Sequence, residues 1–106
     1  MIDKIRHLKE KLEALNDALA DPDIHSDQKR FRDTAREHSD LSRIMEVGEQ
    51  YLKVHHDYEG NKALIREEKD PELVELAEAE LEELEEQKHA LEEKLKVLLV
   101  PKDPND

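Results

Sequence analysis

Five basic residues form the first group in this sequence whose chemistry can be predicted. The chain carries 29 acidic and 17 basic residues, yet in the segment 28–43 the bases outnumber the acids. Arginine presents a planar fork of N–H groups that matches phosphate oxygens, so the segment predicts contact with a phosphate-bearing surface. A solvated helix face of mixed charge is the alternative reading, and it is a common one. The five residues are Lys29, Arg30, Arg32, Arg36 and Arg43.

A metal centre is the next chemistry to consider, because the chain has six histidines and no cysteine. His55 and Glu59 lie one helical turn apart, but two ligands do not complete the four-coordinate set that zinc requires. We therefore expect no metal and no cofactor. His38 and His55 are expected instead to be half-buried, hydrogen-bonded residues of a helix.

A catalytic site needs a nucleophile, a base and a group that orients the base. The serines of the chain are explained as helix caps or helix-surface residues: Ser26, Ser39 and Ser42. The many carboxylates fall on exposed helix faces, where no desolvated pocket separates their pKa values. We expect no catalytic residue and no enzyme activity in this chain.

The elements that would position these residues are helices, and the segment 71–99 is the clearest of them. Asp70 stands where an N-cap belongs and Pro71 where the first helical residue belongs, while Pro101 cannot continue a helix. A stripe with alternating steps of three and four residues runs along the segment and requires a partner surface. Lys88 within it is expected to reach solvent or to set the register. The core stripe consists of Val74, Ala77, Leu81, Leu84, Lys88, Leu91, Leu95 and Leu98.

Two further helices are predicted before this one. Apolar residues at helical spacing predict a helix over about 2–19, and the Asp-Pro-Asp run that follows ends it. A second helix is predicted over about 28–67, with a broad apolar face that suggests two packing neighbours. Ser26 or Asp27 can cap this helix. Gly48 in its interior indicates a close approach of another helix.

The predicted fold is an all-α, antiparallel three-helix bundle dominated by a long hairpin of residues 28–67 and 71–99. The short corner at residues 69–71 makes these two helices antiparallel neighbours. The spacing of Leu64 and Ile65 favours continuation of the helix past Gly60-Asn61. We expect residues 1–99 to form one domain and residues 100–106 to begin a linker.

The composition excludes several classes of protein. Hydrophobic residues make up 36% of the chain and aromatic residues 3%, which suits long helices that each bury one stripe. No apolar run approaches the roughly 18 residues of a membrane-spanning helix, and the N-terminus lacks the apolar core of a signal peptide. A net charge of −12 is opposite in sign to that of duplex-DNA and anionic-membrane binders. We expect a cytoplasmic protein that is a monomer.

Residues 70–106 hold 13 acidic and 4 basic residues, so the last helix has an acidic face. The face attracts a basic protein surface or is simply solvated, and both readings stay open. Glu92 and Lys96 are expected to form an ion pair one turn apart. The acidic residues are Glu78, Glu82, Glu83, Glu85, Glu86, Glu92 and Glu93.

The run Leu98–Asp106 closely resembles the end of the first domain of the bacterial peptide chain release factor 1 family. Arg30-Phe31-Arg32, Leu41-Ser42 and Asp70-Pro71-Glu72 stand at the spacing which that family shows. The resemblance covers essentially the whole chain, and its most specific part is Pro-Lys-Asp-Pro-Asn-Asp. It implies the helical first domain of a class I release factor.

The resemblance further implies a role in stop-codon-dependent (UAA/UAG) release of the nascent chain. That family reads codons with a Pro-x-Thr loop and hydrolyses peptidyl-tRNA with a Gly-Gly-Gln loop, and neither motif occurs in this sequence. The implied partners are the stalk base of the large ribosomal subunit and the GTPase release factor 3. A rival reading is a free-standing coiled-coil scaffold whose leucines pair two chains.

Overall fold

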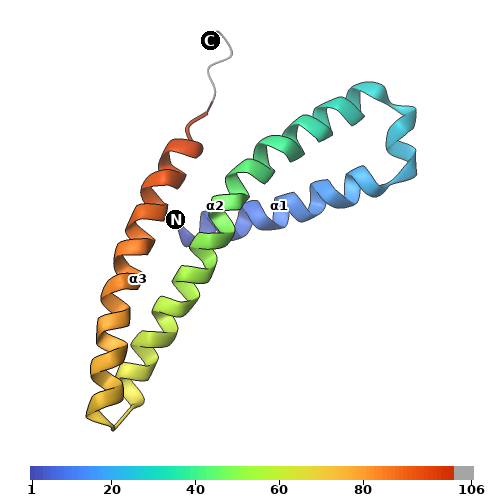
Figure 1. Cartoon of the computed structure of the whole chain (residues 1–106). Helices are drawn as coiled ribbons and strands as arrows, with labels where there is room; N and C mark the ends of the chain where they lie inside the picture. The colour runs from blue at the N-terminus through green and yellow to red at the C-terminus, as the bar shows by residue number, and fades with distance from the viewer. Residues whose placement is uncertain (102–106) are drawn as a thin grey trace. The chain divides into compact units, whose positions relative to one another are not determined.

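The computed structural model describes residues 1–101, and its regular elements are all helical (Figure 1). The α-helices are α1 (Ile2–Ala20), α2 (Gln28–Glu67) and α3 (Pro71–Leu98), and a 3₁₀-helix, η1 (Pro22–Ser26), follows α1. No strand occurs among residues 1–101. The prediction of an all-α fold is confirmed, and each helix ends within one residue of its predicted bounds. Residues 102–106, most of the predicted linker, lie outside the described residues.

The chain divides into two compact units, and α2 contributes to both. Unit 1 comprises residues 1–48, and unit 2 begins at Glu49. The 40-residue helix α2 runs unbroken past Gly60, as its apolar spacing predicts. None of the helices within residues 1–101 is both long enough and apolar enough to cross a membrane.

In unit 1, α1 runs antiparallel to the first half of α2 (Figure 1). Lys11 Nζ lies 2.7 Å from a carboxylate oxygen of Glu37, and the Asn16 side chain contacts Nε2 of His38. Apolar side chains fill the space between the helices. Those buried in this unit are Ile5, Ile24, Leu41 and Met45.

The 3₁₀-helix η1 occupies the stretch that the sequence predicts to be a loop. Pro22 stands in its first turn, and the Asp21 carboxylate accepts a hydrogen bond of 3.0 Å from the backbone N–H of Asp23. The Ser26 hydroxyl donates to the carbonyl of Asp23 at 2.7 Å. These bonds hold Ile24 in a fully buried position. The connection from α1 to α2 is therefore a folded part of unit 1 with its own core residue.

Gly48 marks the close approach of α1 and α2 that the sequence predicts. A Cβ atom added there would lie 2.9 Å from Sδ of Met45 and 3.2 Å from Cγ2 of Ile5. Gly60, in unit 2, differs because an added Cβ would meet no atom within 4 Å. Only at Gly48 does the packing of the helices itself require glycine.

In unit 2, the rest of α2 and α3 form the predicted antiparallel hairpin (Figure 1). Oε1 of Glu68 accepts hydrogen bonds of 3.1 Å from the backbone N–H groups of Lys69 and Asp70, which closes the corner. The Asp70 carboxylate then caps α3 by accepting from the N–H of Glu72 at 3.0 Å. Pro71 occupies the first turn, where its missing N–H costs nothing.

The core stripe of α3 is covered within the chain, because each of its eight residues is buried or half-buried. Tyr51 of α2 is 2% exposed, and its hydroxyl donates a 2.8 Å hydrogen bond to Oε1 of Glu92. Burial, and next the hydrogen bond to this carboxylate, raise the pKa of Tyr51 well above its ordinary value.

Lys88 interrupts the core stripe without leaving a buried charge unpaired. Its ammonium lies 4.9 Å from the ring centroid of Tyr58, and the ammonium of Lys62 lies 5.1 Å from the same centroid. Cations at this distance are attracted to the negative ring face. The half-buried lysine stem packs in the hairpin while the charge rests on an aromatic ring.

The two glycines of the chain are expected to respond oppositely to alanine. Gly60→Ala should raise the free energy of unfolding by about 1 kcal/mol, because alanine favours a helix and meets no neighbour. Gly48→Ala should lower it by about 1 kcal/mol, because displacing Met45 and Ile5 outweighs the same helical gain. Urea unfolding of both variants measures the difference. A stabilised Gly48→Ala would show that the contact with α1 is loose.

Tyr51→Phe is expected to destabilise the chain by about 1 to 2 kcal/mol, because it removes a buried hydrogen bond to a carboxylate. Tyr58→Phe is the control, since it keeps the ring and both lysine contacts. Equal stability of Tyr51→Phe and the unsubstituted chain in urea unfolding would contradict the importance of this bond.

The stability contributed by Tyr51 should be lost at alkaline pH. The phenol of the unfolded chain loses its proton near pH 10, whereas the folded state keeps it to a higher pH. The unfolded state then binds fewer protons, so this contribution is complete below about pH 10 and declines above it. The measurement is the difference in unfolding free energy between the unsubstituted chain and Tyr51→Phe at pH 8 and pH 11. A difference that does not shrink would contradict the assignment.

Candidate functional site

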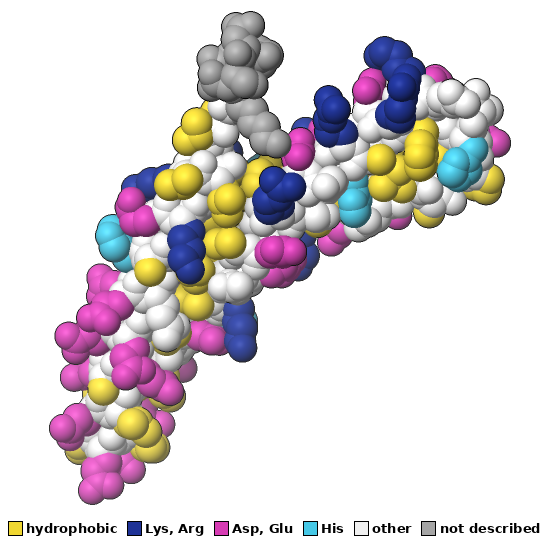
Figure 2. Space-filling model, turned by 45° about the horizontal axis from the view of Figure 1, so that its top comes forward, with side chains coloured by type: hydrophobic (Ala, Val, Ile, Leu, Met, Phe, Trp, Pro, Cys, Tyr) yellow, Lys and Arg dark blue, Asp and Glu magenta, His cyan; other side chains and the backbone are white. Residues whose placement is uncertain are grey.

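The five predicted basic residues all lie on the surface of the part of α2 that belongs to unit 1. A helix turns about 100° per residue, so four of them fall within about 60° of one another around the axis. These four, called the basic stripe below, are Lys29, Arg32, Arg36 and Arg43. Arg30 lies about 100° or more away from each of them. Figure 2 shows Lys and Arg side chains standing out from this part of the chain.

The basic stripe lies on the side of α2 opposite its packed residues. Leu41 and Met45 are 5% and 3% exposed and point toward the core of unit 1. By helical geometry they stand about 150° and 170° around the axis from the middle of the stripe. The basic stripe can therefore meet another molecule without disturbing the packing of unit 1.

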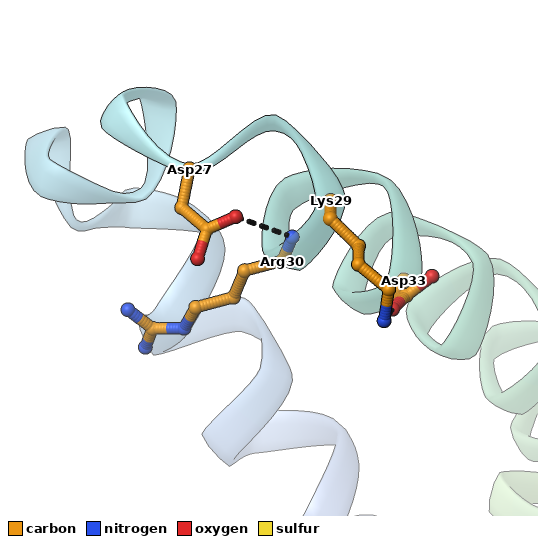
Figure 3. Close-up of polar contacts among 4 residues, drawn as sticks. All are labelled: Asp27, Lys29, Arg30 and Asp33. Atoms are coloured by element: carbon orange, nitrogen blue, oxygen red, sulfur yellow. Dashed lines mark hydrogen bonds and ion pairs between the residues drawn. The ribbon is translucent and has the colours of Figure 1, made fainter.

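The start of α2 is held by two carboxylates (Figure 3). Oδ1 of Asp27 accepts a 3.1 Å hydrogen bond from the backbone N–H of Arg30, so that Asp27, one of the two predicted candidates, caps the helix. Lys29 Nζ lies 3.2 Å from Oδ2 of Asp33. Both side chains of this ion pair are largely exposed, which limits its contribution to stability.

Arg30 points away from Lys29 and Asp33 in the close-up (Figure 3). Its separation from the basic stripe follows from its place two residues before Arg32. Arg32 instead borders a small hollow lined also by His25, Gln28 and Phe31. The rings of His25 and Phe31 lie 5.1 Å apart between centroids. The stripe thus begins next to a half-exposed aromatic ring.

The acidic face of α3 differs from the prediction in its ion pairing. Lys96 Nζ lies 3.0 Å from Oε1 of Glu93, three residues away, whereas Glu92 accepts the Tyr51 hydroxyl. The predicted Glu92–Lys96 pair is therefore wrong, because Glu92 turns toward α2. The hydrogen bond and charge of Lys96 lower the pKa of Glu93.

The predicted histidines lie on helix faces. His38 is half-buried and contacts the Asn16 side chain. His55 is half-buried too, with its ring centroid 6.5 Å from that of Tyr51. Within residues 1–101, no three histidine, aspartate or glutamate side chains are grouped so as to hold a metal ion.

Comparison with known proteins assigns a family to nearly the whole chain. Residues 8–106 match the family model described as the PCRF domain. The peptide chain release factor 1 of Geotalea uraniireducens is 49% identical over all 106 residues, which make up 29% of that relative. The proteins of the same name from Geobacillus kaustophilus and Listeria monocytogenes are each 42% identical over the whole chain, which spans 30% of each relative. The chain thus spans less than a third of these relatives. No solved structure matches it.

Asp27→Ala should lower the free energy of unfolding by about 1 kcal/mol, because the N–H of Arg30 loses its capping acceptor. Asp27→Asn should restore most of the loss, since its side-chain oxygen can accept the same bond. Asp33→Ala is the matched control, and removing its exposed ion pair should cost less than about 0.5 kcal/mol. Thermal unfolding followed by circular dichroism compares the three variants. Equal losses for the two alanine variants would contradict the capping role.

Proposed function

The chain belongs to the PCRF domain family, which it shares with bacterial peptide chain release factor 1, and on this premise we propose that it contacts the ribosome during translation termination. It acts as the helical N-terminal part of a longer factor that directs release of the nascent chain at UAA and UAG codons. The matched relatives are more than three times as long as the chain, which supports this division of labour.

The observation that carries the proposal is the basic stripe. Four cations stand together on the outer side of α2 in a chain whose net charge is −12. Ribosomal RNA presents phosphates at its surface, and arginine binds phosphate oxygens through paired N–H groups. The stripe places its cations over about four turns of helix, so several phosphates can be met at once.

Codon reading and hydrolysis are assigned to other parts of the factor. The chain contains only two glycines, Gly48 and Gly60, so it has no Gly-Gly-Gln, and none of its four prolines begins a Pro-x-Thr. Its contribution is positional: stiff helices add contacts to the large subunit near the stalk base. The GTPase release factor 3 is a further partner, and the site of action is the cytoplasm.

A coiled-coil scaffold that pairs two chains is the rival function, and the burial of the core stripe argues against it. All eight stripe residues are already buried or half-buried in one chain. Pairing two chains through the stripe would require opening the hairpin and exposing Tyr51 and its hydrogen bond to Glu92. We therefore propose a monomer.

Charge reversal tests the proposal in the full-length factor. Arg32→Glu, Arg36→Glu and Arg43→Glu together should weaken ribosome binding by about tenfold or more and reduce its dependence on salt concentration. The control reverses three exposed cations elsewhere: Lys53→Glu, Arg66→Glu and Lys69→Glu. Both triple variants change the net charge equally. A difference in ribosome binding between them therefore reports the effect of where the charges lie.

Binding to ribosomes at several salt concentrations is the measurement, with circular dichroism to confirm that both variants stay helical. Equal binding by the stripe variant and the control would overturn the role of the stripe. Arg30→Glu alone should have a smaller effect than Arg36→Glu, because Arg30 lies off the stripe.

A further inference from the structure

An open groove runs between α2 and α3 in unit 2, and the core of the hairpin does not account for it. It encloses about 630 Å³ and is lined in part by Asp57, Gly60, Leu64, Glu80, Glu83 and Leu84. Leu64 is 42% exposed, and the three carboxylates are exposed. Its lining thus combines two leucines, called the apolar floor below, with three exposed carboxylates, and His56, Asn61 and Gln87 complete it. It is called the acidic groove below.

Gly60 lines the acidic groove, and open space lies beside it. A Cβ atom there would touch nothing within 4 Å, so neither helix packing nor backbone conformation requires glycine at this position. Glycine in a helix interior costs about 1 kcal/mol relative to alanine. No close contact at Gly60 offsets this cost, and the space where a side chain would project is open.

Two exposed leucines lie on α3 between the lining of the groove and the corner of the hairpin. Leu73 and Leu76 are 46% and 64% exposed and do not belong to the core stripe. By helical geometry they lie on the same side of α3 as Glu80, Glu83 and Leu84, within about 100° around the axis. An exposed apolar patch with a polar rim is typical of an interaction surface.

The charge around the acidic groove indicates the charge of a molecule that would bind there. The segment 57–87 contains 13 acidic and 3 basic residues. Among residues 1–101, no ion pair involves Asp57, Glu80 or Glu83, so their charges are not neutralised within the unit. In Figure 2, acidic side chains gather over the hairpin of unit 2, with hydrophobic side chains between them.

We infer that the acidic groove of unit 2 binds an amphipathic helix of a partner protein, with leucine-like side chains on one face and lysine or arginine beside them. The apolar face would rest on Leu64, Leu76 and Leu84, and the flanking cations would meet Glu80 and Glu83. The part of α3 from Leu73 to Gln87 spans about 20 Å, which corresponds to roughly 14 residues of a bound helix.

Other occupants fit the acidic groove less well. RNA would bring phosphates against uncompensated carboxylates, which repel them. A second copy of the same hairpin would bring like charges together across the groove. The inference does not depend on the basic stripe, which lies in unit 1 and is tested by separate substitutions.

The test uses the whole 106-residue chain and a designed 15-residue peptide with leucines at helical spacing and lysines between them. Calorimetry measures affinity, and the amide resonance of Gly60 reports where the peptide binds. Glu80→Lys with Glu83→Lys should weaken binding by about tenfold. The matched control, Glu78→Lys with Glu85→Lys, makes the same change in charge on the far side of α3 and should weaken it less than threefold.

A second pair of variants tests the apolar contact. Leu76→Ser should weaken binding by about tenfold, whereas Val97→Ser, at a residue that is 74% exposed near the other end of α3, should not change it. A scrambled peptide of equal composition should bind at least tenfold more weakly than the designed one, because it presents no apolar stripe.

Four outcomes of the peptide experiments would overturn the inference. They are absence of binding at millimolar peptide, equal binding of the scrambled peptide, equal losses in both charge variants, and a Gly60 shift that depends on chain concentration without peptide. The last result would identify a second copy as the occupant. A short RNA that shifts Gly60 would reject the protein partner in the same way. None of these outcomes affects the ribosome-binding comparison of the basic stripe.

Discussion

The apolar arc of α2 is the constraint on which both units depend. With 36% hydrophobic residues, the chain cannot enclose a thick core, so each helix must cover a stripe of another. α2 meets this need twice, since its first half packs with α1 and its second half with α3. Gly48 allows the close contact in unit 1, and Tyr51 fills the start of unit 2 with a hydrogen-bonded ring. Because these contacts use one side of α2 in unit 1, the other side is left to the basic stripe.

Helix periodicity and caps made most of the fold predictable. Asp70 and Pro71 mark the start of α3 through local hydrogen bonding, which depends on neighbouring residues alone. The same local logic limits the cap of α2 to Ser26 or Asp27, and the structure shows that it is Asp27. The 3₁₀-helix η1 was not predicted, because burial of Ile24 depends on the packing of α1 and α2 around it. The Asp-Pro-Asp run, with a capping aspartate before a proline, carried a signal for it that a search for loops overlooks.

The sequence predicts which basic residues belong to the candidate site, but it does not predict which of them share one face of α2. Charge counting finds all five basic residues, yet only their angular positions separate Arg30 from the rest. Glu92 shows why ion pairs cannot be predicted from spacing alone. Its spacing of four residues predicts a pair with Lys96, but in the folded chain Glu92 accepts a hydrogen bond from Tyr51, and Lys96 pairs with Glu93. The acidic groove could not be predicted, because the sequence shows only that the helix continues past Gly60, and the space beside this residue is defined only when α3 is in place.

The placement of the aromatic residues makes the two units distinguishable in solution. The chain has no tryptophan, and both tyrosines, Tyr51 and Tyr58, belong to unit 2. Tyrosine emission therefore follows the melting of unit 2, whereas far-ultraviolet circular dichroism sums the helices of both units. Superimposable transitions would mean that α2 couples the units into one cooperative folding block. Separated transitions would mean that a single helix can be ordered in one half while its other half has lost its partner.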